Sequence, residues 1–98
     1  MQIVTKGVAG TMESSDIIVR VEPGEGKGVE LTLTSAVMQQ FGKQIEKVIR
    51  ETLAELGVED AVVDAVDKGA LDCTVEARVK TAAYRAANSE DYVWGTKK

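Results

Sequence analysis

The stretch from residue 36 to residue 56 constrains the fold most strongly, because its apolar residues recur at spacings of three and four. This spacing places them along one side of an α-helix, with the charged residues outside the stripe. Ser35 is a candidate N-cap for this helix, and Gly57 is suited to end it. The predicted apolar stripe consists of Val37, Phe41, Ile45, Val48, Ile49, Leu53 and Leu56.

Four other segments have the character of β-strands. Residues 29–34 alternate between apolar and polar side chains, which predicts a strand with one buried and one solvated face. Residues 16–22 also alternate, residues 61–66 form a short fourth strand, and residues 3–12 give a weaker first strand. The first three strands follow one another over short connections, so we predict that they form an antiparallel meander.

The segment from residue 71 to residue 86 fits two patterns. Its first half alternates like a strand, with Cys73, Val75, Ala77 and Val79 separated by polar residues. Over its whole length a helix fits better. We therefore predict a helix with an apolar side made of Leu71, Val75, Val79, Ala82, Ala83 and Ala86.

Together these elements predict a single α+β domain over residues 1–98. We expect a small antiparallel sheet, made of about a three-stranded meander plus a fourth strand, with two helices packed on one face. The tail from about residue 88 is polar apart from Tyr92, Val93 and Trp94, and we expect it to be loose. Trp94 fits either a partner contact or a side chain that pins the tail onto the domain.

The composition argues against a free-standing enzyme. The chain has no histidine, so acid–base or metal chemistry would have to use perturbed carboxylates, a lysine or the single cysteine. One tryptophan, two tyrosines and one phenylalanine offer little with which to line a small-molecule pocket. The acidic residues at 59, 60, 64 and 67 match no calcium loop, and we expect no metal site.

Charge and hydropathy also narrow the partners and the compartment. A net charge of −4 gives no electrostatic reason to bind nucleic acid. The chain has neither an apolar run that could span a membrane nor the pattern of a signal peptide at its start. A single cysteine excludes an internal disulfide. We therefore expect a cytoplasmic protein that contacts neither membrane nor nucleic acid.

Two adjacent serines, Ser14 and Ser15, stand between acidic residues in the stretch "GTMESSDIIV" at residues 10–19. Serine and aspartate favour turns, and from the pattern alone a simple polar turn is the commoner interpretation. A nucleophilic serine needs an adjacent base, and the chain has no histidine to provide one. A serine modified by another enzyme needs only exposure, so the sequence favours a modified serine over a catalytic serine.

Cys73 allows two interpretations as well. Free cysteine is usually buried and acts as a small hydrophobic residue, which is the commoner case. A cysteine near the start of a helix can instead have a lowered pKa and be reactive.

Three stretches of the chain resemble the acyl carrier (gamma) subunit of bacterial citrate lyase: "VAGTMESSDIIVRVEP" at 8–23, "QQFGKQIEKVIRETLAELGV" at 39–58 and "DKGALDCTVEARV" at 67–79. The first is the most specific, because the attachment motif of that family is similar to G-T-(L/M)-E-S-(S/G)-D. The resemblance places the modified serine at Ser14, with Ser15 as a neighbouring hydroxyl. The domain of residues 1–98 is then an acyl-carrier domain.

The resemblance implies a covalent cofactor, 2'-(5''-phosphoribosyl)-3'-dephospho-CoA, joined to Ser14 through a phosphodiester. It also implies that the chain presents acetyl and citryl thioesters to an alpha (transferase) subunit and a beta (lyase) subunit, which convert citrate to oxaloacetate and acetate. A prosthetic-group transferase would attach the arm. The chain lacks the Asp-Ser-Leu motif of phosphopantetheine carriers. In this interpretation it is a non-catalytic carrier, and Cys73 is not the working thiol.

The residues around Ser14 have expected roles. Gly10 would let the backbone bend so that Ser14 is presented, while Glu13 and Asp16 would be read by the transferase or keep the turn solvated. Three alternatives remain open at this point: a carrier for a related complex such as malonate decarboxylase, an unmodified structural or interaction subunit, and a small thiol enzyme that uses Cys73.

Overall fold

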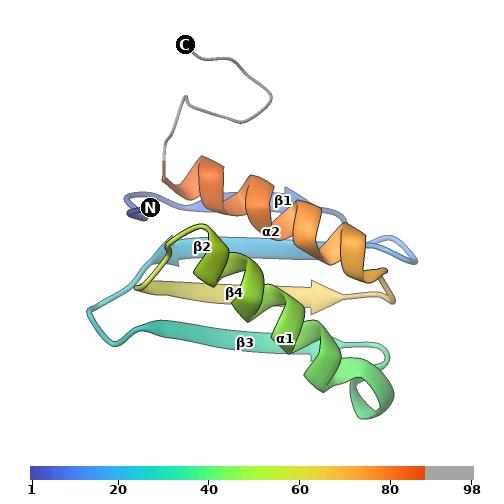
Figure 1. The fold of residues 1–98 in the computed structure, drawn as a ribbon. Coiled ribbons are helices and arrows are strands. Elements are labelled where there is room, and N and C mark those ends of the chain that lie inside the picture. The colour runs from blue at the N-terminus through green and yellow to red at the C-terminus, as the bar shows by residue number, and fades with distance from the viewer. Residues whose placement is uncertain (88–98) are drawn as a thin grey trace.

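The computed structural model describes residues 1–87, and the predicted loose tail with Tyr92 and Trp94 lies outside them. Both helices lie on one face of a four-stranded sheet (Figure 1). No helix within residues 1–87 is long and apolar enough to cross a membrane. The elements in chain order are β1 (Gly7–Gly10), β2 (Ile17–Pro23), β3 (Val29–Ser35), α1 (Met38–Glu55), β4 (Ala61–Asp67) and α2 (Asp72–Ala86).

The sheet is mixed, with strand order β1-β2-β4-β3. β2 pairs antiparallel with both β1 and β4, whereas β3 pairs parallel with β4. The α+β class and the two helices on one face are confirmed. The purely antiparallel sheet and its meander are wrong, because β4 lies between β2 and β3. The long helix α1 is the cause: it returns the chain to the starting end of β3, so that β4 runs parallel to β3.

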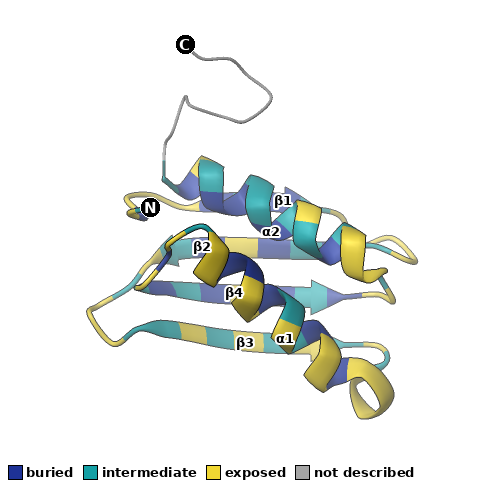
Figure 2. Cartoon of the chain, in the orientation of Figure 1, coloured by how far each residue is buried: buried dark blue, intermediate teal, exposed yellow. Residues whose placement is uncertain are grey.

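Burial explains why β4 takes a central position. Its helix-facing side chains, at Ala61, Val63, Ala65 and Asp67, are all buried, whereas those of β3 are only half-buried. Buried residues concentrate where the helices face β2 and β4 (Figure 2). The largest fully buried apolar side chains are Ile17, Val19, Val21, Ile49, Leu53, Val63, Val75 and Val79.

The first predicted helix is confirmed, with a corrected start. Ser35 is not its N-cap, because α1 begins at Met38 and the cap residue is Val37. The Ser35 hydroxyl instead accepts a hydrogen bond from the Val37 amide at 3.0 Å. Gly57 follows the helix with a φ of +75°, as expected of a residue that ends it. The predicted stripe is wrong at Phe41, which is 53% exposed.

The second predicted helix is confirmed as α2, although Leu71 precedes it and is exposed instead of lying on its buried side. The buried side of α2 ends in small residues, which let β1 approach closely. A β-carbon at Gly7 would overlap the Ala82 carbonyl oxygen and the Ala86 amide nitrogen. This close packing fixes β1, and with it the loop that leads from β1 to β2.

Candidate functional site

Ser14 lies in the loop of residues 11–16, which joins β1 to β2 at one end of the sheet. The connections at 36–37 and 68–71 lie at the same end, the right-hand end in Figure 1. Ser14 is exposed, and its hydroxyl has no hydrogen-bond partner within residues 1–87. This hydroxyl is therefore available to an external enzyme.

Gly10 introduces the loop in a conformation that suits glycine. Its φ is +103°, and a β-carbon there would overlap the carbonyl oxygen of Ile17 on the paired strand. Any other residue would meet both left-handed backbone strain and a steric clash. This geometry agrees with the expected role of Gly10 in bending the backbone.

Asp16 holds the other end of the loop through four hydrogen bonds to its carboxylate. Arg78 on α2 donates from Nε to Oδ1 at 3.1 Å and from Nη2 to Oδ2 at 2.8 Å. The Thr11 hydroxyl donates to Oδ2 at 2.6 Å, and the Ile17 amide donates to Oδ1 at 2.7 Å. The side chain of Asp16 is 13% exposed. We call this arrangement the Asp16 clamp.

The clamp fixes the charge of Asp16. Its hydrogen bonds from Arg78, then from Thr11 and the Ile17 amide, hold the pKa of the carboxyl well below its usual range. The same contact raises the pKa of Arg78. Asp16 is thus an anchor that is ionised at neutral pH rather than a proton acceptor. Its carboxylate is already occupied within the chain, which favours a structural role over direct recognition by a transferase.

Arg78 is the residue of this site that sequence reasoning missed. It lies 62 positions from Asp16, and no local motif joins the two residues. Only the packing of α2 along β1 and β2 brings the guanidinium to the loop.

The backbone of the loop is also tied to the turn that follows β4. Ser15 donates its amide to the Lys68 carbonyl at 2.8 Å, and Lys68 donates its amide to the Asp16 carbonyl at 2.8 Å. The buried Asp67 carboxylate in turn accepts hydrogen bonds from the Ser35 hydroxyl and from the amides of residues 69 and 70. All three connections at this end therefore form one hydrogen-bonded unit.

Ser15 has a φ of +67°. Glycine adopts this left-handed conformation readily, whereas serine does so at some cost. The motif that this stretch resembles has serine or glycine at this position, and the backbone gives the physical reason. Ser14, the other serine of the pair, does not have a positive φ, so its backbone does not favour glycine.

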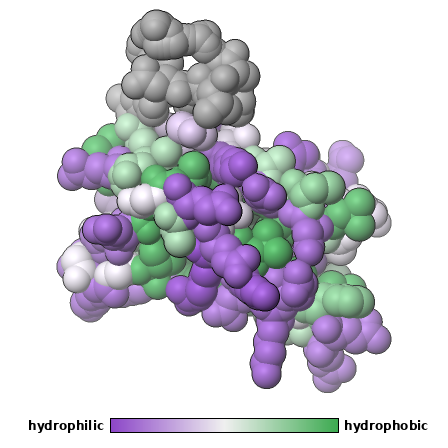
Figure 3. All heavy atoms as spheres, in the orientation of Figure 1, coloured by the Kyte–Doolittle hydropathy of each residue, from purple (hydrophilic) through white to green (hydrophobic). Residues whose placement is uncertain are grey.

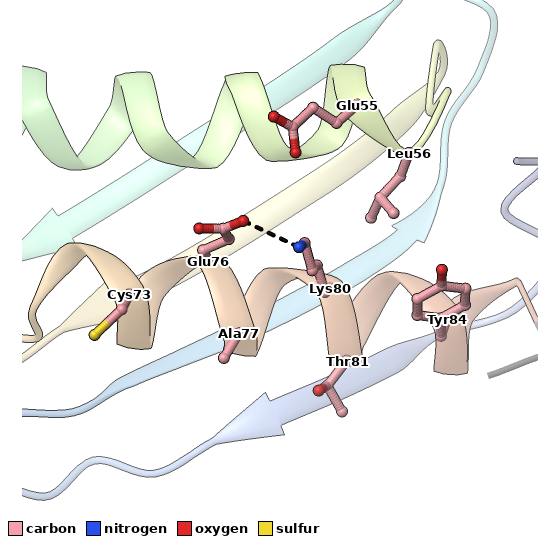
Figure 4. Close-up of a pocket in the computed structure, with 8 residues that line it drawn as sticks. All are labelled: Glu55, Leu56, Cys73, Glu76, Ala77, Lys80, Thr81 and Tyr84. Atoms are coloured by element: carbon pink, nitrogen blue, oxygen red, sulfur yellow. Dashed lines mark ion pairs between the residues drawn. The ribbon is translucent and has the colours of Figure 1, made fainter. Parts of the chain in front are cut away.

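A hollow runs along α1 and α2 (Figure 4). It is lined by residues of both helices, and Cys73 lies at the opposite end of its α2 side from Tyr84. Lys80 pairs with Glu76 at 3.0 Å, and that contact raises the pKa of Lys80, so this lysine stays protonated. Lys80 is therefore not suited to act as a base for a thiol.

Cys73 itself is exposed, so the commoner interpretation of a buried cysteine is wrong. It falls on the solvent side of α2, opposite the apolar side that packs on the sheet. Within residues 1–87 no group of three or more cysteine and acidic side chains is placed to hold a metal ion.

Comparisons with known proteins bear on the whole domain. Residues 4–86 match the family model described as the acyl carrier protein (ACP) "Malonate decarboxylase delta subunit (MdcD)". The fold is similar to a chain in the crystal structure of a Pseudomonas malonate decarboxylase hetero-tetramer in complex with malonate. That likeness has a TM-score of 0.70 at 17% identity and covers 88% of this chain and 92% of the other. At this identity it shows the fold.

Curated relatives are much more similar in sequence. The citrate lyase acyl carrier protein of Streptococcus mutans is 56% identical, over 96% of this chain and 92% of that protein. The protein of the same name from Escherichia fergusonii is 53% identical, over 97% of this chain and 98% of the relative. The chain therefore belongs to the family of citrate lyase acyl carrier proteins, which are carriers within a lyase complex rather than catalytic subunits.

Proposed function

We propose that this acyl carrier holds a 2'-(5''-phosphoribosyl)-3'-dephospho-CoA group on Ser14 through a phosphodiester and serves a citrate lyase complex. One observation carries the assignment to Ser14. Its hydroxyl is exposed and unpartnered within residues 1–87 in a loop held from both sides, and Ser14, unlike Ser15, which is also exposed, does not have a positive φ. A long covalent group needs such an attachment point, because a buried or bonded hydroxyl would have to be released first.

The surroundings of Ser14 support this fit. Gly10 and the Asp16 clamp fix the two ends of the loop, so the hydroxyl is presented in a defined position without being shielded. Asp16 is neutralised by Arg78 rather than directed at Ser14. The Asp16 carboxylate thus does not repel the incoming phosphate as an unpaired carboxylate would.

The group itself supplies a thiol that bears the acyl residue as a thioester. The chain itself carries the arm on Ser14, holds the loop around the attachment point in place and presents the arm to partner subunits. Tethering raises the local concentration of the acyl group at each active site without any new contact. The alpha and beta subunits of citrate lyase are the proposed catalytic partners, and a prosthetic-group transferase is the proposed modifying enzyme.

Intact mass spectrometry with peptide mapping tests the attachment. The chain is produced in cells that also make the cofactor-attaching enzymes, alongside Ser14→Ala and the matched control Ser15→Ala. We expect a mass increase equal to the phosphoribosyl-dephospho-CoA group in the native chain and in Ser15→Ala, but not in Ser14→Ala. An unmodified native chain, with attaching enzymes shown to be active, would favour an unmodified interaction subunit.

A second assay distinguishes citrate lyase from malonate decarboxylase as the complex served. The family model and the shared fold allow both, whereas the 51–56% identities to citrate lyase carriers favour the first. The loaded chain is added to citrate lyase alpha and beta subunits and, separately, to malonate decarboxylase subunits. Restoration of malonate decarboxylation alone would overturn the proposed substrate.

A further inference from the structure

A groove of about 570 Å³ opens between the start of α1 and the turn that precedes α2. Most of its lining is apolar, and polar groups stand at Gln44 and Asp72. This size and composition are typical of sites that take small organic ligands. The lining residues are Val37, Phe41, Gln44, Ile45, Gly69, Ala70, Leu71, Asp72 and Cys73.

The apolar residues of this groove are unusually exposed. Phe41 is 53% and Leu71 is 70% exposed, and both lie outside the core that the helices and the sheet share. Met12, in the Ser14 loop, and Met38, at the start of α1, are also exposed. Figure 3 shows hydrophobic surface at this end of the molecule. Exposed apolar clusters of this kind mark sites that bind a ligand or a partner.

The groove begins next to the Ser14 loop. Lys68 exchanges backbone hydrogen bonds with Ser15 and Asp16, and the residues that directly follow it line the groove. The side chain of Lys68 is exposed and forms no ion pair within residues 1–87. Lys68 therefore lies, along the backbone, between the residues bonded to the Ser14 loop and those that line the groove.

The geometry points to this groove as a resting site for the thiol-bearing arm of the carrier's own prosthetic group. The inference rests on the proposed attachment at Ser14. Such an arm carries a phosphodiester at its attachment, then ribosyl and adenosine units and a diphosphate, and beyond them a chain of amides and methyl groups that ends in the thiol. This chemistry matches a lysine followed by an apolar groove whose polar groups, Gln44 and Asp72, hydrogen-bond each other at 2.9 Å and keep further donor and acceptor capacity for the amides of the arm.

Tethering makes weak binding sufficient. A group joined by a flexible linker meets a nearby site at an effective concentration on the order of millimolar. A groove with an intrinsic dissociation constant of about 1 mM would thus be occupied about half of the time. The arm would remain available to the catalytic subunits, since such an interaction is easily displaced.

Amide chemical shifts in NMR spectra locate the arm. Spectra of the unmodified and the loaded chain are compared, with loading confirmed by intact mass. We expect loading to shift the amides of residues 41, 44 and 69–73 as well as those of residues 11–16. In the variants Phe41→Gln and Leu71→Gln, the chemical-shift changes that loading causes at these groove residues should be at most half of those in the native chain. They should persist in Val4→Gln, a matched control that is 55% exposed and lies by the other end of α2.

Cys73 provides an independent proximity test, because it lines the groove. Diamide oxidises the thiol of the arm and the thiol of Cys73 to one disulfide, and is itself reduced to the hydrazine as it takes up both hydrogens. We expect this internal disulfide to form several-fold more slowly in Phe41→Gln and Leu71→Gln than in the native chain and Val4→Gln.

The outcomes separate the two proposals. A chain that gains no mass contradicts the proposed attachment at Ser14. A loaded chain whose shifts stay within residues 11–16, and whose disulfide forms equally fast in all variants, contradicts the groove while the attachment stands. Groove shifts that appear only after a catalytic subunit is added would assign the groove to a protein partner and overturn the inference.

Discussion

The Asp16 clamp is predicted to stabilise the domain and to hold the Ser14 loop. Arg78 and Asp16 form two charge-assisted hydrogen bonds, at 2.8 and 3.1 Å. Buried bonds to charged groups contribute about 1.5–3 kcal/mol, and solvent-exposed ion pairs contribute about 0.2–1 kcal/mol. This pair lies between the two cases, because the side chain of Asp16 is 13% exposed and that of Arg78 is 39% exposed.

We therefore expect Asp16→Asn to lower the free energy of unfolding by about 2 kcal/mol and Arg78→Gln by about 1 kcal/mol. The aspartate change costs more because Thr11 and the Ile17 amide also lose a charged acceptor. For a domain of this size, 2 kcal/mol corresponds to a fall in melting temperature of about 10 °C. Urea unfolding at pH 7 measures each variant, with Arg20→Gln, an exposed arginine, as the control.

The double variant separates the pair from the individual side chains. If the clamp acts as described, Asp16→Asn combined with Arg78→Gln costs about 1 kcal/mol less than the sum of the single changes. Additive effects would refute the clamp as an energetic unit. We also expect both single variants to be loaded more slowly at Ser14 by the attaching enzymes, whereas Arg20→Gln should be loaded at the native rate.

The pH dependence has a definite sign. The pKa of Asp16 is lower in the folded chain than its unfolded value of about 3.9. The contribution of the ionised Asp16 carboxylate to the free energy of unfolding is thus fully present above the pKa of the unfolded chain. It is lost as the pH falls through the lower pKa of the folded chain. The stability difference between the native chain and Asp16→Asn should be constant from about pH 5 to pH 8 and shrink below about pH 4. A difference that shrinks between pH 7 and pH 5 would contradict this assignment.

Three further predictions concern the rest of the fold, each measured by urea unfolding. Gly10→Ala should lower the free energy of unfolding by at least about 2 kcal/mol more than Gly26→Ala, since both glycines have positive φ but only a β-carbon at position 10 would clash. Equal losses of stability would argue against the clash. Leu53→Ala should cost about 2–5 kcal/mol because Leu53 is 1% exposed, whereas Leu71→Ala should change stability by less than about 0.5 kcal/mol. Asp67→Asn should lower the free energy of unfolding by about 1–3 kcal/mol, because at least one of the three donors that bond its buried carboxylate loses its acceptor; a neutral effect would show that the unit at this end of the sheet does not depend on the carboxylate.

The resemblance of "GTMESSD" identified the family, and the comparisons confirm it. Period and alternation located the helices and the strands within a few residues, because burial of one side imposes a repeat that is visible in the chain itself. The sequence did not predict the exposure of Phe41 and Leu71. A helical repeat shows which side of a helix is apolar, but not how far the neighbouring layer extends.

The sequence by itself determined the local elements, the α+β class and the position of Ser14 in a polar turn, since these depend on residues that are close along the chain. Tertiary structure alone decided the strand order, because the pairing of β4 with both β2 and β3 depends on how α1 crosses the sheet. It also decided the partner of Asp16, because a guanidinium 62 positions away reaches the loop only when α2 packs along β1 and β2.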